Sequence, residues 1–260
     1  MRNHLTVYAV PAALLGLVCV AASQNTQSAK SQIKSQAFDP ADLSGIWMSH
    51  NARGSNFSMG GTAPPMTEWA QARYDAARPG LGPRGKPLGN DPMMVCDPMG
   101  FPRIMFWTNY PIEIVRIPGR TLMFFDWFYT YRTIWTDGRA LPEDPDPRFY
   151  GYSAGKWDGD TFVIQSKGFD DRTWLDADGH PHTEDMVLEE RYRRVSPDMI
   201  EFTMTLTDPK AYKAPWFSAK MNMTRADQVT KMREDVCVPS VEAKYKEQIR
   251  DPAGGATPNK

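Results

Sequence analysis

The feature that most constrains the fold is a succession of short strand-like runs separated by turn signals, which begins near residue 112. In the run Glu201–Leu206, apolar residues alternate with Glu and Thr, which is typical of a strand with one buried face. An Asp-Gly pair at Asp158 and Gly159 favours a tight hairpin between two such runs. Strands joined in this way predict an all-β antiparallel meander, and hence a sandwich or a closed barrel. The predicted strands are 112–117, 121–135, 150–157, 161–166, 186–195, 199–206 and 217–224.

The segments on either side of this meander have a different character. Residues 51–103 contain many Gly and Pro, which predicts irregular loop. Within them, Thr67–Arg78 reads as one short helix that Thr67 caps and that ends before Pro79. Residues 240–250 predict a short C-terminal helix. We therefore expect residues 40–260 to form a single domain with an N-terminal extension of loop and short helix.

The N-terminus has the pattern of a cleaved secretory signal. Arg2 precedes an uncharged apolar run, Val7–Val20, and small residues follow it up to Ser23. The run is too short for a membrane span, which needs about 20 apolar residues. We predict that residues 1–23 are a signal peptide, that 24–39 are a flexible tether, and that the mature protein is periplasmic or secreted with no membrane span. Lipidation at Cys19 is the less favoured alternative, because the preceding Val fits a lipoprotein signal poorly.

Cleavage after Ser23 would leave Cys96 and Cys237 as the cysteines of the mature chain. In an oxidising compartment such a pair is expected to form a disulfide, although two free buried thiols are an alternative. The mature chain would carry 29 basic and 31 acidic residues, a net charge of −2. This charge argues against a dedicated nucleic-acid-binding protein, which would present a basic face.

The segment Asp42–Trp47 resembles the opening of lipocalin-like, calycin-type β-barrels, in which a Gly-x-Trp begins the first strand. The resemblance implies that Trp47 plugs the closed end of a barrel and that an Arg from the last strand packs on it. Arg225 matches that position. A cation–π contact of this kind contributes about 0.5–2 kcal/mol.

A second resemblance covers most of the mature chain. Several segments, including a Gly-His-Pro-His-Thr-Glu motif, are similar to those of a large group of exported bacterial proteins that are mainly uncharacterised. The resemblance implies a shared fold and carries no activity. The similar segments are 126–132, 136–142, 155–161, 168–175, 179–184 and 207–212.

The densest polar segment is 168–185, which holds five Asp, two His, one Glu and one Arg. His180 and His182 are two residues apart, which would place both on one face of an extended segment. Such a pair binds Zn²⁺ or Cu²⁺ when a third ligand joins it. The third ligand would come from Asp176, Asp178 or Glu184.

Other interpretations of this segment stay open. Pro181 bends the chain, so each imidazole could instead bond to a neighbouring group in a rigid loop. A His beside a carboxylate can also act as a general acid or base, as His182 with Glu184 or His180 with Asp176. Covalent catalysis is disfavoured, because there is no Gly-x-Ser-x-Gly motif and both mature cysteines are expected to pair. A calcium loop is disfavoured as well, because the later ligands of an EF-hand are missing.

Arg132 lies within an aromatic predicted strand and must meet a carboxylate or a ligand, because an unpaired buried charge is costly. Asp126 and Glu189 are the expected protein partners. In the alternative interpretation, Arg132 holds an anionic or carbonyl group of a ligand, with Tyr129 or Tyr131 beside it. The charge run 189–194 reads as the solvated face of a strand.

Two functions remain open at this point, because a fold does not decide between them. The first is an exported carrier that binds a small hydrophobic or aromatic molecule in the barrel. Its candidate binding residues are Arg132, Tyr129, Tyr131 and Trp174. The second is an isomerase, lyase or hydrolase on the same barrel, either cofactor-independent or metal-dependent. Its candidate catalytic residues are His180, His182, Asp176 and Glu184.

Overall fold

The computed structural model describes residues 38–49, 63–80, 84–86, 88–107, 110–226, 230–233 and 236–255. The predicted signal peptide and Cys19 lie outside the described residues. The described residues 38–255 belong to one compact unit, Gln36–Lys260.

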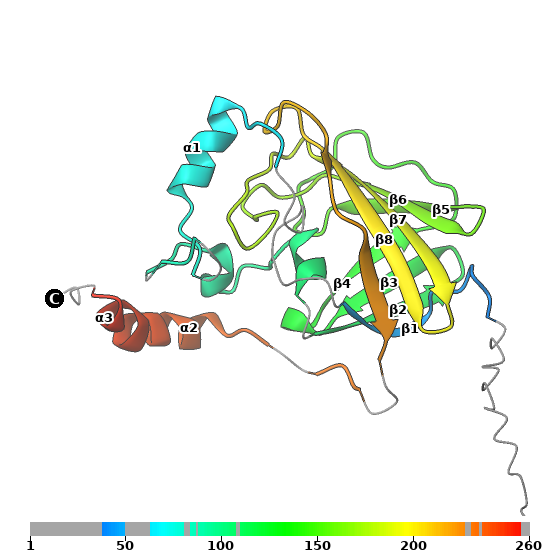
Figure 1. Cartoon of the computed structure of the whole chain (residues 1–260). Coiled ribbons are helices and arrows are strands. Elements are labelled where there is room, and N and C mark those ends of the chain that lie inside the picture. The colour runs from blue at the N-terminus through cyan, green and yellow to red at the C-terminus, as the bar shows by residue number, and fades with distance from the viewer. Residues whose placement is uncertain are drawn as a thin grey trace, which may run out of the picture. The chain divides into compact units, whose positions relative to one another are not determined.

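The centre of the protein is a closed nine-stranded β-barrel, as predicted for an all-β chain (Figure 1). The sheet closes because β10 pairs with β1 on one side and with β8 on the other. A short extra strand, β9 (Trp216–Phe217), pairs with the other edge of β8. The barrel strands are β1 (Gly45–Ser49), β2 (Pro111–Ile117), β3 (Arg120–Phe125), β4 (Thr130–Trp135), β5 (Tyr152–Asp158), β6 (Thr161–Lys167), β7 (Val187–Ser196), β8 (Met199–Thr207) and β10 (Met221–Arg225).

Two predicted strands are each divided in the structure. The run 121–135 forms β3 and β4, which pair antiparallel around the turn η3 (Trp127–Tyr129). Phe128 and Tyr129 adopt positive φ angles of 58° and 47° in this turn. Because aromatic residues rarely adopt that conformation, the sequence carries no turn signal there. The run 217–224 likewise divides between β9 and β10.

One pairing differs from the predicted antiparallel meander. β4 and β5 run parallel and pair through only two registered positions, Ile134 with Ser153 and Trp135 with Ala154. A long connection, residues 136–151, returns the chain to the start of β5. The first part of β4 therefore has no partner strand on this side, and the barrel wall is open there.

The contact that the lipocalin resemblance implied is present. The guanidinium of Arg225 lies 4.6 Å from the centre of the Trp47 ring. Trp47 is fully buried, and its indole N–H donates to the carbonyl of Leu43 at 2.9 Å. Gly45 permits this approach, because a Cβ at that position would lie 2.4 Å from Nη1 of Arg225.

The interior of the barrel is packed with side chains rather than open. The inward residues of β8 alternate as predicted, with Phe202, Met204 and Leu206 buried. The segment 99–106, which includes η2 (Arg103–Phe106), adds five buried apolar side chains to the same core. Among the described residues, a pocket of about 540 Å³ lies where β4 and β5 separate.

The helical extensions agree with the sequence. Helix α1 (Glu68–Ala76) begins at Thr67, whose hydroxyl accepts from the backbone N–H of Ala70 at 3.3 Å. The C-terminal segment forms α2 (Pro239–Tyr245), a π-helical turn η4 (Lys246–Arg250) and α3 (Asp251–Ala253). Among the described residues, no helix has the length and apolar character needed to cross a membrane.

The predicted disulfide joins Cys96 to Cys237, across 141 positions of sequence. Cys96 follows the short helix η1 (Pro92–Val95), and Cys237 precedes α2. The bond therefore fastens the C-terminal segment to the long loop that fills the core. Bonds of this type persist in oxidising compartments outside the cytoplasm.

Candidate functional site

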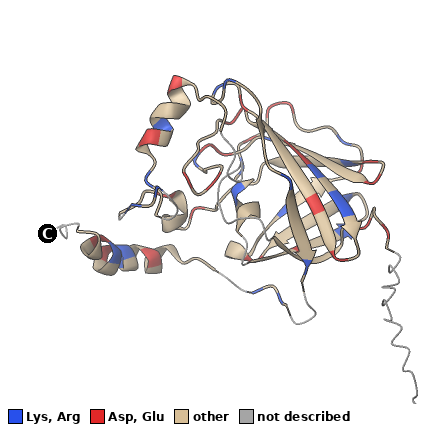
Figure 2. Ribbon diagram, viewed as in Figure 1, with Lys and Arg blue, Asp and Glu red and all other residues tan. Residues whose placement is uncertain are grey.

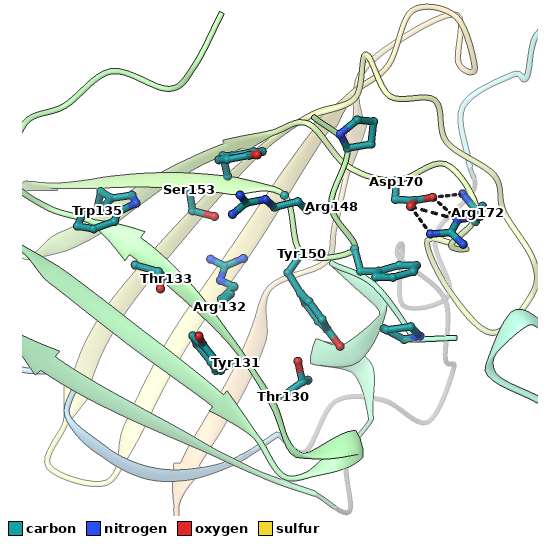
Figure 3. A pocket seen from close by; sticks show the side chains of 15 residues that line it. Thr130, Tyr131, Arg132, Thr133, Trp135, Arg148, Tyr150, Ser153, Asp170 and Arg172 are labelled. Carbon is teal, nitrogen blue, oxygen red and sulfur yellow. Dashed lines mark hydrogen bonds and ion pairs between the residues drawn. The ribbon is translucent and has the colours of Figure 1, made fainter. Parts of the chain in front are cut away.

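The largest pocket described, about 540 Å³, lies where β4 and β5 separate, and we call it the seam pocket (Figure 3). Residues from both faces of the two strands line it, among them the buried Arg132 and Ser153 and the more exposed Tyr131 and Trp135. Its volume is within the range of about 300–1,000 Å³ that small-molecule sites occupy.

Aromatic side chains form much of the wall of the seam pocket. They come from the outer face of β4 and from the segment that leads into β5. Burial raises the pKa of Tyr150 well above its usual range, so this hydroxyl stays protonated. The aromatic lining residues are Tyr131, Trp135, Phe149, Tyr150 and Tyr152.

Arg132 reaches the seam pocket from the inner face of β4 and is almost completely buried. Its Nη2 donates to both carboxylate oxygens of Glu190, at 2.8 and 3.0 Å. Its guanidinium also lies 3.9 Å from the centre of the Phe101 ring. In the described part of the chain, Nε and Nη1 of Arg132 have no hydrogen-bond partner.

The partner of Arg132 is therefore Glu190, and neither of the two carboxylates expected from the sequence. Asp126 instead binds Arg233 at 2.7 Å, and Glu189 lies on the other face of β7. The charge run 189–194 is thus not wholly a solvated face. Alternate residues of β7 point inward, so Glu190, Tyr192 and Arg194 are buried.

The other side of the seam pocket is built by residues 147–152, which backbone hydrogen bonds hold in place. The N–H of Arg148 donates to the carbonyl of Gly168 at 3.0 Å, and the N–H of Phe101 donates to that of Phe149 at 3.1 Å. Gly151 adopts a φ of +60°, and a Cβ there would lie 2.9 Å from the carbonyl oxygen of Lys167. This backbone conformation, beside the pocket, therefore requires glycine at position 151.

Two further arginines line the seam pocket. Arg172 forms an ion pair with Asp170 at 2.7 Å, and this hydrogen bond holds the pKa of Asp170 below its usual value. Arg148 lies with its guanidinium 4.3 Å from the centre of the Tyr152 ring. Figure 2 shows both signs of charge spread over the described chain, so this group of arginines is a local feature.

The other predicted binding residues occupy different positions. Tyr131 lines the seam pocket and is exposed. Tyr129 lines a neighbouring pocket of about 370 Å³, which also contacts Tyr131 and Phe124. Trp174 does not line the seam pocket and instead lies 5.5 Å from the guanidinium of Arg103.

His180 forms the carboxylate pair that the sequence suggested. Its Nδ1 lies 2.7 Å from Oδ2 of Asp176, and both residues are buried. The ring stacks on Tyr74 with centroids 4.5 Å apart and meets the edge of Trp216 at 4.9 Å. The other oxygen of Asp176 accepts the backbone N–H groups of Asp178 and His180.

His182 lies in a separate environment. Its Nδ1 donates to the backbone carbonyl of Thr183 at 3.1 Å, so in the neutral ring Nε2 accepts from the hydroxyl of Thr173 at 2.8 Å. The ring meets the edge of Phe169, and burial lowers the pKa of His182 below its usual value of 6.5. Glu184, its expected partner, is exposed at the surface.

The structure therefore does not bring the two imidazoles together. Among the described residues, the side chains whose ligand atoms lie within 4.8 Å of one another are those of Asp176, Asp178 and His180. All three are buried. The alternation rule fails between His180 and His182 because the chain from Gly179 to Thr183 is not an extended strand.

Sequence reasoning missed most of the seam pocket. The parallel pairing of β4 with β5 brings residues 148–153 against β4, and no turn signal indicates a parallel pair. The one signal available was the aromatic run Phe149–Tyr152 directly after Arg148, at the start of a predicted strand.

Comparison of the chain with protein-family models, with curated proteins and with solved structures found no match. The closed nine-stranded barrel is compatible with a lipocalin-like fold. Function must therefore be argued from the pocket and its chemistry.

Proposed function

We propose that this protein is exported and binds a small hydrophobic or aromatic molecule in the seam pocket. The observation that carries the proposal is one pocket of about 540 Å³ that combines five aromatic side chains with the buried guanidinium of Arg132. Binding sites for small molecules typically join an apolar or aromatic wall to a few fixed polar groups. The disulfide between Cys96 and Cys237 supports an oxidising compartment, as the predicted signal peptide does.

The position of the pocket supports binding rather than structural packing alone. Among its lining residues, Tyr131 is exposed and Trp135 and Tyr152 are half-buried, while Arg132 is almost completely buried. A ligand can therefore place its ring among the aromatic side chains and its polar end near the guanidinium. The backbone hydrogen bonds of Arg148 and Phe149 hold the opposite wall in place, which limits the entropy lost on binding.

The test is a titration with 2-naphthol, a two-ring aromatic molecule that is neutral at pH 7, followed by its fluorescence. Thr133→Trp places a large side chain at the pocket, because Thr133 lines it. Thr203→Trp is the matched control, on β8 and away from the pocket. We expect saturable binding that Thr133→Trp abolishes and Thr203→Trp retains. Absence of saturable binding, or equal binding by both variants, would refute the proposal.

The cluster of Asp176, Asp178 and His180 supports a second candidate, a metal-dependent enzyme. Two carboxylates and one imidazole are a donor set that binds divalent transition metals. Both oxygens of Asp176 already bind groups of the same loop, so the cluster is also satisfied as a structural element. Elemental analysis of protein purified without chelators distinguishes a metal site from a purely structural cluster. A stoichiometric metal that Asp178→Asn removes supports the enzyme, and a metal-free protein refutes it.

A further inference from the structure

The charges on the wall of the seam pocket do not balance. Three arginines line it, and Asp170 is the one carboxylate among the described lining residues. Arg172 occupies that carboxylate through two nitrogens, with Nη2 at 2.7 Å and Nε at 2.9 Å. The pocket is therefore left with Arg132 and Arg148, of which only Arg132 has a carboxylate partner in the described chain.

Arg132 is only partly satisfied by that partner. Glu190 takes Nη2 alone, and the same carboxylate also accepts the hydroxyl of Tyr192 at 2.7 Å. Nε and Nη1 remain buried without a partner in the described part of the chain. A buried donor without an acceptor costs about 1–3 kcal/mol, and more in a charged group. An acceptor brought by a ligand would remove that cost.

The geometry of the guanidinium limits how such an acceptor binds. Nη2 faces Glu190, and the edge of the guanidinium between Nε and Nη1 is occupied by Cδ, so a single carboxylate cannot take both remaining donors as a parallel pair. One oxygen of a ligand's carboxylate can bind one of these two donors. The other oxygen of that carboxylate must then bind a donor from another residue nearby.

Arg148 is placed to supply that donor. It is exposed, and no carboxylate of the described residues lies within ion-pair distance of its guanidinium. Figure 3 shows the side chains of Arg132 and Arg148 reaching the same part of the pocket, beside Ser153. Two cations that share one pocket repel each other, and an anion between them attracts both and offsets that repulsion.

We propose that the ligand of the seam pocket is an aromatic carboxylate, with its carboxylate between Arg132 and Arg148 and its ring against the aromatic wall. This inference rests on the proposed function, because it names the class of molecule that the same pocket binds. Phe149 and Tyr150 also line the pocket and provide apolar surface for the ring. The pocket volume of about 540 Å³ suits a molecule with one or two rings.

The test compares 1-naphthoate with its neutral methyl ester by isothermal titration calorimetry on the full mature chain. A carboxylate that forms charged hydrogen bonds should bind about tenfold or more tightly than the ester. Arg148→Met should remove most of this preference, as should the charge-neutral double variant Arg132→Met with Glu190→Gln. Arg191→Met on β7 is the matched control, since Arg191 is exposed and does not line the pocket.

The outcomes distinguish failure of the carboxylate assignment from failure of the proposed function. If the ester binds as tightly as the acid and Thr133→Trp blocks both, the proposed function stands and the carboxylate assignment is refuted. If 2-naphthol binds but neither 1-naphthoate nor its ester does, the carboxylate assignment fails alone, and if none of the three binds, both proposals fail. 1-Naphthyl phosphate is the third probe, and tighter binding of the phosphate than of 1-naphthoate would overturn the choice of a carboxylate. Retention of the acid preference in Arg148→Met would overturn the bridging role of Arg148.

Discussion

Arg132 and Glu190 form a buried ion pair across the barrel, with both carboxylate oxygens within 3.0 Å of Nη2 of the arginine. β4 and β7 are not neighbours in the sheet, so the pair joins strands that backbone hydrogen bonds do not connect. Burial, together with the nearby charge of Glu190, raises the pKa of Tyr192, which therefore remains a hydrogen-bond donor to this carboxylate. The pair fixes a buried guanidinium in the lining of the seam pocket.

Removal of one partner should be more harmful than removal of both. Glu190→Gln leaves the Arg132 guanidinium buried without a counter-charge, which should lower the free energy of unfolding by about 3–5 kcal/mol. The double variant Arg132→Met with Glu190→Gln should lose less, since no charge is left unpaired. Urea denaturation measures both values. Glu189→Gln, on the outer face of β7, is the control and should change stability by no more than about 0.5 kcal/mol. A double variant less stable than the single one would contradict this account.

Much of the fold was predictable, because local pattern determined it. The alternation in β8 and the Asp-Gly turn depend on residues whose chemistry is visible in the sequence. The packing of Arg225 on Trp47 was expected from the resemblance to lipocalin-like barrels. The disulfide followed from the cysteine count and the expected compartment.

The site was less predictable because it depends on one long-range pairing. The parallel contact of Ile134 with Ser153 places Arg148 beside Arg132, and neither residue carries a local signal for that arrangement. The partner of Arg132 was misjudged for a similar reason. Glu189 and Glu190 differ by one position, and the register of β7 against β6 and β8 decides which one points inward.

The turn between β3 and β4 should be strained, and relief of that strain is measurable. Tyr129 holds a φ of 47°, a conformation that costs about 1–3 kcal/mol for a residue other than Gly. The residue is 62% exposed, so little packing is lost when the ring is removed. Tyr129→Asn should therefore raise the free energy of unfolding by about 1 kcal/mol, because Asn tolerates this conformation better. Tyr131→Asn is the control, since Tyr131 is similarly exposed but lies in a strand. Equal effects of the two substitutions in thermal unfolding would disprove the strain.

Acid should destabilise the protein in part through His182. Burial lowers the pKa of this imidazole below 6.5, so as the pH falls the unfolded chain binds the proton first. The stability that His182 contributes is therefore complete above about pH 6.5 and declines as the pH falls from there toward the folded pKa. His182→Asn keeps a hydrogen-bonding side chain and cannot titrate. The difference in urea midpoint between wild type and this variant should shrink between pH 7 and pH 5. A constant difference across that range would show that His182 titrates normally in the folded state.

The disulfide should contribute through the long loop that it closes. Cys96 and Cys237 are 141 positions apart, and in the chain-entropy model a loop of this length stabilises by about 5 kcal/mol. The double variant Cys96→Ser with Cys237→Ser should therefore unfold at a much lower urea concentration than the oxidised wild type. Dithiothreitol should lower the wild-type midpoint to that of the variant and leave the variant unchanged. Because the bond fastens α2 to the loop that packs into the core, proteolysis near Cys237 should also become faster in the variant. If the variant and the oxidised wild type unfold at the same urea concentration, the bond does not stabilise the fold in this way.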